Sequence, residues 1–205
     1  MMLLFAAVQE ERGPRRERKK KAVLTPTPPT QILADGSTQS FFRALIGSLS
    51  KMAIHPDLAG LSTYEKIMLA HGRWMHFFVL TLAQWQEVIS LPAHKELDSL
   101  TEAWKSLGLH SNEWRLVEVL ALTGRGMAHH PSPIASKIAA LNDVVYMALA
   151  KYEVCNFPLD PIRLTQISLL LSRLESVSPI LLANFLANHN PLLISQLIQH
   201  AFISI

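Results

Sequence analysis

The sequence holds a single cysteine, Cys155, and few residue patterns that carry catalytic chemistry. One cysteine excludes an internal disulfide, and such usage is typical of a reducing compartment, so we expect the cytoplasm or the nucleus. The motifs Gly-x-Ser-x-Gly, His-Glu-x-x-His and Cys-x-x-Cys are absent, and no paired-carboxylate arrangement appears. Gly124 and Gly126 have too few further glycines for a phosphate-binding loop. We therefore predict a protein that is not an enzyme and has no cofactor or metal.

The sequence also lacks an uninterrupted apolar run of about 20 residues, the length that a membrane span needs. No Asp, Glu, Lys or Arg follows Glu175, but prolines, asparagines and a histidine interrupt this C-terminal segment. We expect it to form two short core helices. A membrane-associated hairpin and a buried oligomer contact are the alternatives. The apolar start MMLLFAAV has no basic residues before it, so we predict no secretory signal.

Charge is scarce, at 17% of the chain, and unevenly distributed. Residues 1–21 contain seven basic and three acidic residues, whereas the remainder is nearly neutral. Hydrophobic residues make up 49% of the chain, enough for a folded core. We predict a flexible basic arm with a Pro/Thr-rich spacer over residues 1–36, and a single helical domain over residues 37–205.

The basic arm contains six bases within seven positions: Arg15, Arg16, Arg18, Lys19, Lys20 and Lys21. Such a run is typical of a nuclear-localisation signal or of a segment that attracts phosphates, and a merely solvated tail is the third interpretation. No aromatic residue lies within residues 6–40, so stacking on bases is not expected there. Binding to RNA or DNA through this arm would therefore be non-specific.

Residues 61–92 predict the central element of the fold. Ser62 and Glu65 have the spacing of a capping box, so a helix should begin at Thr63, and Pro92 should end it near residue 90. Its length would be about 40 Å. Apolar residues recur at helical spacing and also occupy other faces of its second half, which favours neighbours on several sides. Lys66, Arg73, Gln84 and Glu87 mark its predicted polar edge.

Further helices follow from capping residues and apolar spacing. A helix capped by Ser37 or Thr38 should reach Ile54, and Ser111 should cap a short helix that ends at Gly124. Four Ser, Asp or Asn residues directly precede a proline, a pattern typical of helix starts. We predict helices at about 93–107, 133–154, 161–176, 179–188 and 191–203. With no strand pattern, the chain is predicted to be an all-α compact bundle of seven or eight helices around the long central one.

Nine histidines and four tryptophans are candidates for other sites. His71 and His76 point about 140° apart around a helix and cannot easily share a metal, and His71 is expected in the core. His129 and His130 lie in a predicted loop without nearby Asp, Glu or Cys, so they form a weak ligand set. The tryptophans are expected in the core, with an interface contact as the alternative.

Three short segments, Tyr64-x-x-Ile67-Met68, Leu80-Thr81-Leu82 and Leu122-Thr123-Gly124, resemble the helical accessory C proteins of morbillivirus-type paramyxoviruses. The chain after Gly124 has no counterpart in this resemblance. The resemblance implies a small regulatory protein with a flexible basic N-terminus that acts in the control of viral RNA synthesis and host interferon responses.

We therefore predict a non-catalytic helical protein that binds a protein partner, or itself, through apolar helix faces. Its basic arm would serve nuclear targeting or attraction of polyanions. The alternative is a nucleocapsid-type RNA-binding structural protein. That function would require Arg73, Lys105, Arg115 or Arg125 to form a basic groove, and the near-neutral charge of the body argues against it. A third option, an enzyme that uses His71 or His129 and His130, ranks last.

Overall fold

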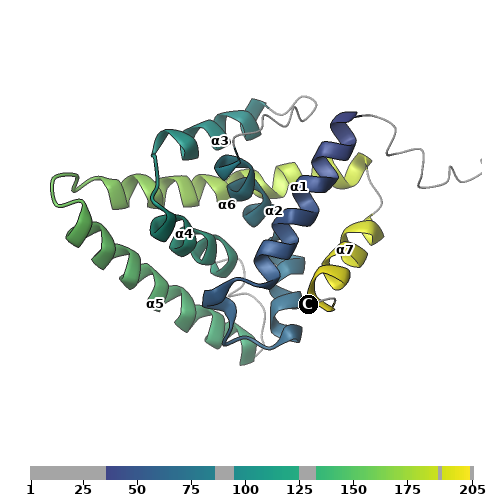
Figure 1. The fold of residues 1–205 in the computed structure, drawn as a ribbon, viewed down its shortest axis with the longest axis horizontal. Helices are drawn as coiled ribbons and strands as arrows, with labels where there is room; N and C mark the ends of the chain where they lie inside the picture. Colours follow the sequence, from purple (N-terminus) through teal and green to yellow (C-terminus); the bar gives the residue numbers. More distant parts are fainter. Residues whose placement is uncertain (1–35, 86–94, 125–132, 189–190, 204–205) are drawn as a thin grey trace, which may run out of the picture.

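The computed structural model describes residues 36–85, 95–124, 133–188 and 191–203, which fold into helices without any strand (Figure 1). The prediction of an all-α bundle is confirmed. Seven α-helices and one short 3-10 helix make up this part of the chain: α1 (Gly36–Ala53), η2 (Pro56–Leu58), α2 (Thr63–Gln84), α3 (Lys95–Ser106), α4 (Ser111–Thr123), α5 (Pro133–Asn156), α6 (Arg163–Asn188) and α7 (Pro191–Ile203).

The start of α2 is confirmed in detail. The Ser62 hydroxyl accepts a hydrogen bond from the Glu65 N–H at 3.3 Å, and the Glu65 carboxylate accepts one from the Ser62 N–H at 2.7 Å. The helix ends at Gln84 rather than at residue 90, because Trp85 has extended backbone angles. There the Trp85 indole lies against Gly47 of α1. Glu87 and the predicted continuation beyond Trp85 lie outside the described residues.

Helix α2 is the centre of the bundle. It contacts α1, α3, α4, α6 and α7, and every residue from 73 to 83 is buried. The predicted neighbours on several sides of its second half are therefore confirmed. Two predictions for this helix are wrong, since His71 is exposed and Arg73 is 3% exposed. His71 lies in the half of α2 where burial is incomplete, whereas the burial that encloses residues 73–83 also includes Arg73 at the predicted polar edge.

Helix α6 corrects the largest error in the predicted boundaries. Ser178 and Pro179 do not start a new helix, because one helix continues from Arg163 to Asn188. A proline inside a helix removes one backbone donor and crowds the preceding turn, at about 3 kcal/mol. Here the helix packs against α2, α3, α4 and α5, and Ser178 is buried in that packing. Tertiary contact thus outweighs the local preference for a break.

The other predicted helix boundaries agree within a few residues. Helices α5 and α7 begin at Pro133 and Pro191 as predicted, and α6 begins two residues after Pro161. The N-cap of α4 is His110 rather than Ser111, and its N–H donates to the Glu113 carboxylate at 2.7 Å. Helix α1 begins at Gly36, so Ser37 and Thr38 belong to the helix.

The buried apolar side chains of the described residues form one continuous cluster that joins all seven α-helices. The C-terminal segment contributes to it through Ile194, Ile198 and Phe202 of α7, a helix that packs against α1 and α2. The expectation of a C-terminal core helix is thus confirmed for α7. No helix in the described part of the chain is long and apolar enough to cross a membrane.

Candidate interaction cleft between α4, α5 and α6

Helices α5 and α6 form a V whose arms are joined at the turn between them. Figure 1 shows the two helices diverging from that turn, with α4 lying between them. Both arms contact α4, which forms the floor of the space. This space is a cleft of about 850 Å³. Its lining comes from three helices: Leu120, Thr123 and Gly124 of the α4 end; Ala135, Ile138, Ala139, Asn142, Asp143, Tyr146 and Met147 of α5; Ser168, Leu171, Ser172 and Glu175 of α6.

The cleft has a mixed lining of polar and apolar side chains and an acidic edge. Among the described residues that line it, Asp143 and Glu175 are the charged ones, and none is Lys or Arg. Asp143 is exposed and makes no hydrogen bond or ion pair with any residue that the structure describes. The Asn142 side-chain amide donates to the Thr123 hydroxyl at 2.9 Å, which joins α5 to the floor. The cleft therefore offers negative charge beside a lining of mixed polar and apolar side chains.

Glu175 is fixed in position by residues behind the cleft. Arg73 Nη1 donates to Glu175 Oε1 at 2.5 Å, and Arg73 Nη2 donates to the Gly124 carbonyl at 2.7 Å. His76 Nε2 lies 3.1 Å from Arg73 Nη1 and 3.5 Å from Glu175 Oε2. Burial alone would raise the pKa of Glu175, but contact with His76 and the charge of Arg73 hold that pKa below its ordinary value. The carboxylate is therefore ionised and 37% exposed.

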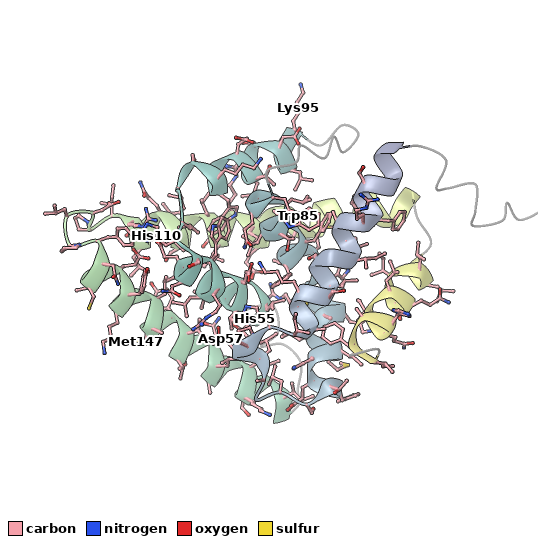
Figure 2. All side chains as sticks on the ribbon, in the orientation of Figure 1. His55, Asp57, Trp85, Lys95, His110 and Met147 are labelled. Atoms are coloured by element: carbon pink, nitrogen blue, oxygen red, sulfur yellow. The ribbon has the colours of Figure 1, made fainter. Side chains whose placement is uncertain are left out.

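Exposed apolar side chains gather on the same two helices and on the turn that joins them. Of twelve large apolar side chains that are exposed in the described residues, seven lie within residues 144–169. Figure 2 places Met147 on the outer side of α5. Scattered single apolar residues are ordinary on a protein surface, whereas a concentration in one hairpin is typical of a binding surface. We call this set the hairpin face: Val144, Tyr146, Met147, Val154, Leu159, Ile162 and Leu169.

A buried group of charges stabilises the joined end of the V, near His110 (Figure 2). Arg163 Nε and Nη2 donate to both oxygens of Glu113 at 2.7 and 2.9 Å, and Arg163 also donates to the Leu107 carbonyl. Glu153 of α5 lies 3.4 Å from the Arg163 Nε and is 4% exposed. A single cation therefore faces two buried carboxyl groups.

The two carboxyl groups have opposite pKa shifts. Burial and the neighbouring Glu113 carboxylate raise the pKa of Glu153 to about 7. Burial also acts to raise the pKa of Glu113, but the hydrogen bonds from Arg163 and from the His110 N–H outweigh it, so this pKa is lowered. Glu113 is thus the ionised member of the pair, and Glu153 is largely protonated below neutral pH.

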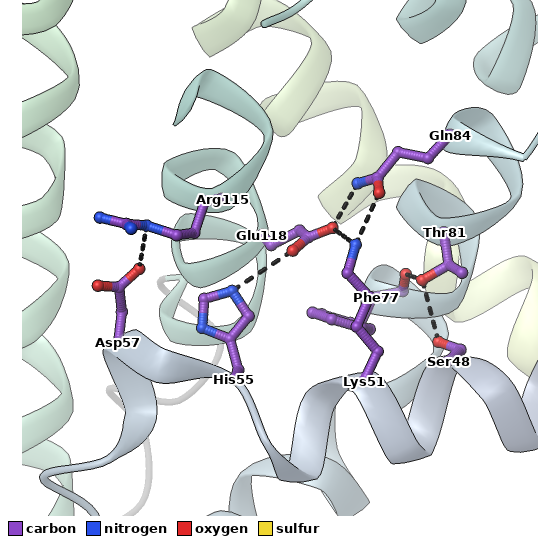
Figure 3. Close-up of polar contacts among 9 residues, drawn as sticks. All are labelled: Ser48, Lys51, His55, Asp57, Phe77, Thr81, Gln84, Arg115 and Glu118. Carbon is purple, nitrogen blue, oxygen red and sulfur yellow. Dashed lines mark hydrogen bonds and ion pairs between the residues drawn. The ribbon is translucent and has the colours of Figure 1, made fainter. Parts of the chain in front are cut away.

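A second polar group joins α1, α2 and α4 away from the cleft (Figure 3). Glu118 of α4 accepts hydrogen bonds from Lys51 of α1 and Gln84 of α2, and His55 Nε2 lies 3.4 Å from its other oxygen. Burial acts to raise the pKa of Glu118, but His55 and Lys51 lower it overall. With every member engaged in helix contacts, we interpret this group as structural.

The sequence-based site candidates have different outcomes. Arg15, Arg16, Arg18 and Lys19 to Lys21 lie outside the described residues, as do Arg125, His129 and His130. Among the bases suggested for a nucleic-acid groove, Arg73 is buried and pairs with Glu175, Lys105 pairs with Glu102, and Arg115 pairs with Asp57. No group of three metal-ligating side chains occurs in the described part of the chain.

The sequence analysis missed both acids of the cleft and the buried pair Glu113 and Glu153. One signal was present for Arg73, which directly precedes a long apolar run in a central helix and so was a candidate for burial. Nothing in the sequence links Glu175 to Arg73, because the two residues belong to helices that are far apart along the chain. The described residues thus form a helical bundle with a cleft between α4, α5 and α6. No protein-family model matches the chain.

Proposed function

We propose that this protein is a non-catalytic interaction protein that binds another protein through the hairpin face and the adjoining cleft. The observation that carries the proposal is the concentration of exposed apolar side chains on α5, α6 and the turn between them. Burying such side chains against a partner stabilises a complex by about 25 cal/mol per Å² of apolar surface, before the entropic cost of association. The resemblance of three segments to viral accessory C proteins suggests regulation of RNA synthesis or of a host response as the setting.

The basic residues 15–21 would have a separate role in this proposal. They would direct the chain to the nucleus, or raise its concentration near nucleic acid through phosphate contacts. The alternative, a nucleocapsid-type RNA-binding protein, has less support because Arg73, Lys105 and Arg115 already pair with carboxylates. It would depend on the basic arm and on bases other than these three.

The test compares two triple variants of the full chain. The face variant replaces Val154, Leu159 and Leu169 with Glu, at side chains that are 64% to 97% exposed. The matched control replaces Ile54, Tyr64 and Ile203 with Glu, at side chains that are 64% to 71% exposed elsewhere on the surface. Proximity labelling in cells records which proteins lie near each variant, and sedimentation equilibrium records self-association.

We expect the face variant to lose specific neighbours, or its self-association, that the wild type and the control variant keep. All three proteins should unfold at similar temperatures, because exposed positions contribute little to stability. Identical neighbours and identical oligomeric states for all three proteins would contradict the proposal. A loss of self-association alone would identify a second copy of the chain as the partner.

A further inference from the structure

We infer that the cleft between α4, α5 and α6 binds one amphipathic helix of a partner protein, and that a lysine or arginine of this helix pairs with Asp143 and Glu175. The inference rests on the proposed function, and it adds the site, the secondary structure and the charge of the bound segment. Three observations support it: the shape of the cleft, the sign of its charges and its continuity with the hairpin face.

The shape favours a helix. The cleft lies between two diverging helices and a third helix that contacts both of them (Figure 1). Tyr146 and Met147 of α5 and Leu171 of α6 supply accessible apolar side chains, and an amphipathic helix buries such contacts through residues spaced three and four apart. Strand addition requires an exposed sheet edge, and the described residues form no sheet.

The charge favours a base on the bound helix. Asp143 on α5 lacks a charged partner among the described residues, and Glu175 on α6 presents a partly exposed, ionised carboxylate on the opposite wall. A carboxylate accepts up to about four hydrogen bonds, so Glu175 can accept one from a ligand while it keeps Arg73. None of the described lining residues is Lys or Arg, so Asp143 and Glu175 would repel an acidic segment or a phosphate group in the cleft.

The cleft is also continuous with the hairpin face. Tyr146 and Met147 line the cleft, and they are 41% and 68% exposed. A helix in the cleft would cover these side chains and lead onto the outer surface of α5. The chain's own basic residues 15–21 are a poorer fit, because that run has no apolar residue to contact the walls.

The test uses a display library of helical peptides with randomised surface positions, selected against the full-length protein. Ala139→Trp fills the cleft at a lining position of α5. Ala140→Trp is its matched control, because Ala140 is the next residue, is exposed and does not line the cleft. Asp143→Asn tests the charge. Glu175 is left unchanged, since its substitution would also unpair Arg73.

We expect the selected peptides to carry a lysine or arginine within an apolar stripe. Their affinity should fall about tenfold or more with Ala139→Trp and about fivefold with Asp143→Asn, and it should stay unchanged with Ala140→Trp. Replacing the basic residue of the peptide with norleucine should weaken binding to the wild type but have little further effect on Asp143→Asn, because both changes remove one interaction.

Three results would overturn the inference. The first is selection of peptides that lack a lysine or arginine. The second is selection of peptides that bind the Ala139→Trp protein as tightly as the wild type. The third is a marked gain in peptide affinity when residues 1–35 are removed, because this gain would assign the cleft to the chain's own N-terminus. If the face variant loses neighbours in cells while Ala139→Trp keeps them, the cleft inference fails and the proposed function stands. If the face variant and Ala139→Trp both keep their neighbours, the cleft inference and the proposed function both fail.

Discussion

Arg73 of α2 and Glu175 of α6 are 102 positions apart in the chain, yet their side chains form an ion pair with 2.5 Å between Nη1 and Oε1. The arginine is 3% exposed and the glutamate 37% exposed, so the pair connects the centre of the bundle to the cleft. The two partners differ in how much water reaches them. Removing either one should therefore have a different effect on stability.

Glu175→Ala should destabilise the protein more than Arg73→Met. Without Glu175, the Arg73 guanidinium is a buried cation without its counter-ion, and we expect a loss of about 2 to 3 kcal/mol, below the usual value for a fully buried pair because Glu175 is partly hydrated. Without Arg73, water can still solvate the Glu175 carboxylate, so we expect about 1 kcal/mol. Urea denaturation of both variants measures the difference. Equal losses, or the reverse order, would contradict this interpretation of the pair.

Gly124→Ala should also be destabilising, although the backbone angle at Gly124 suits any residue. A Cβ atom there would overlap the Glu175 carboxylate, so the ion pair or the end of α4 must shift, at about 1 to 3 kcal/mol. The matched control is Gly60→Ala, where a Cβ would meet nothing within 4 Å. Thermal unfolding of both variants tests the prediction, and a Gly124→Ala protein as stable as the control would refute it.

Glu153→Gln should raise stability above neutral pH. The pKa of Glu153 is about 7 in the folded protein and has an ordinary value of 4.5, so the folded state binds more protons between these values. The contribution of this group to stability therefore falls as pH rises from about 4.5 to 7, and it stays low above that range. Glutamine imitates the protonated form, so the variant should be more stable at pH 8 by on the order of 2 kcal/mol.

The measurement for Glu153→Gln is the free energy of unfolding of wild type and variant between pH 4 and pH 8. The difference between their free energies of unfolding should be small at pH 4 and should grow as the pH rises from about 4.5 to 7. Glu113→Gln is the contrasting variant, since it removes the ionised partner of Arg163 and should destabilise the protein at pH 8. A pH-independent difference for Glu153→Gln would show that Glu153 does not titrate in this range.

Removal of residues 15–21 should change polyanion binding or nuclear localisation and leave thermal unfolding nearly unchanged. Titration of single-stranded RNA over a salt series measures the first effect, and a chain that begins at Thr30 provides a second truncation. If the full chain binds with a steep salt dependence and the truncated chains do not, the arm is the element that binds nucleic acid. Equal RNA binding by the full and truncated chains would assign nucleic-acid binding to the helical body and favour the nucleocapsid-type alternative. A large loss of stability would show that the arm belongs to the core.

Local signals in the sequence were sufficient for most of the helices. Ser62 and Glu65 form the predicted capping box, and Pro133 and Pro191 begin helices as predicted, because such features depend only on residues within one turn. Pro179 was misinterpreted for the same reason. Its local preference is to end a helix, and the packing of α6 against four other helices outweighs it.

By itself, the sequence determined the helical class, the central position of the helix that begins at Thr63 and the contrast between a basic N-terminus and a nearly neutral body. The tertiary structure alone decided where buried charges meet. Arg73 looked like a polar edge because helical periodicity counts apolar residues and cannot identify a counter-ion 102 positions away. The cleft, the Glu113 and Glu153 pair and the hairpin face depend likewise on how α4, α5 and α6 pack, and that geometry is a property of long-range contacts.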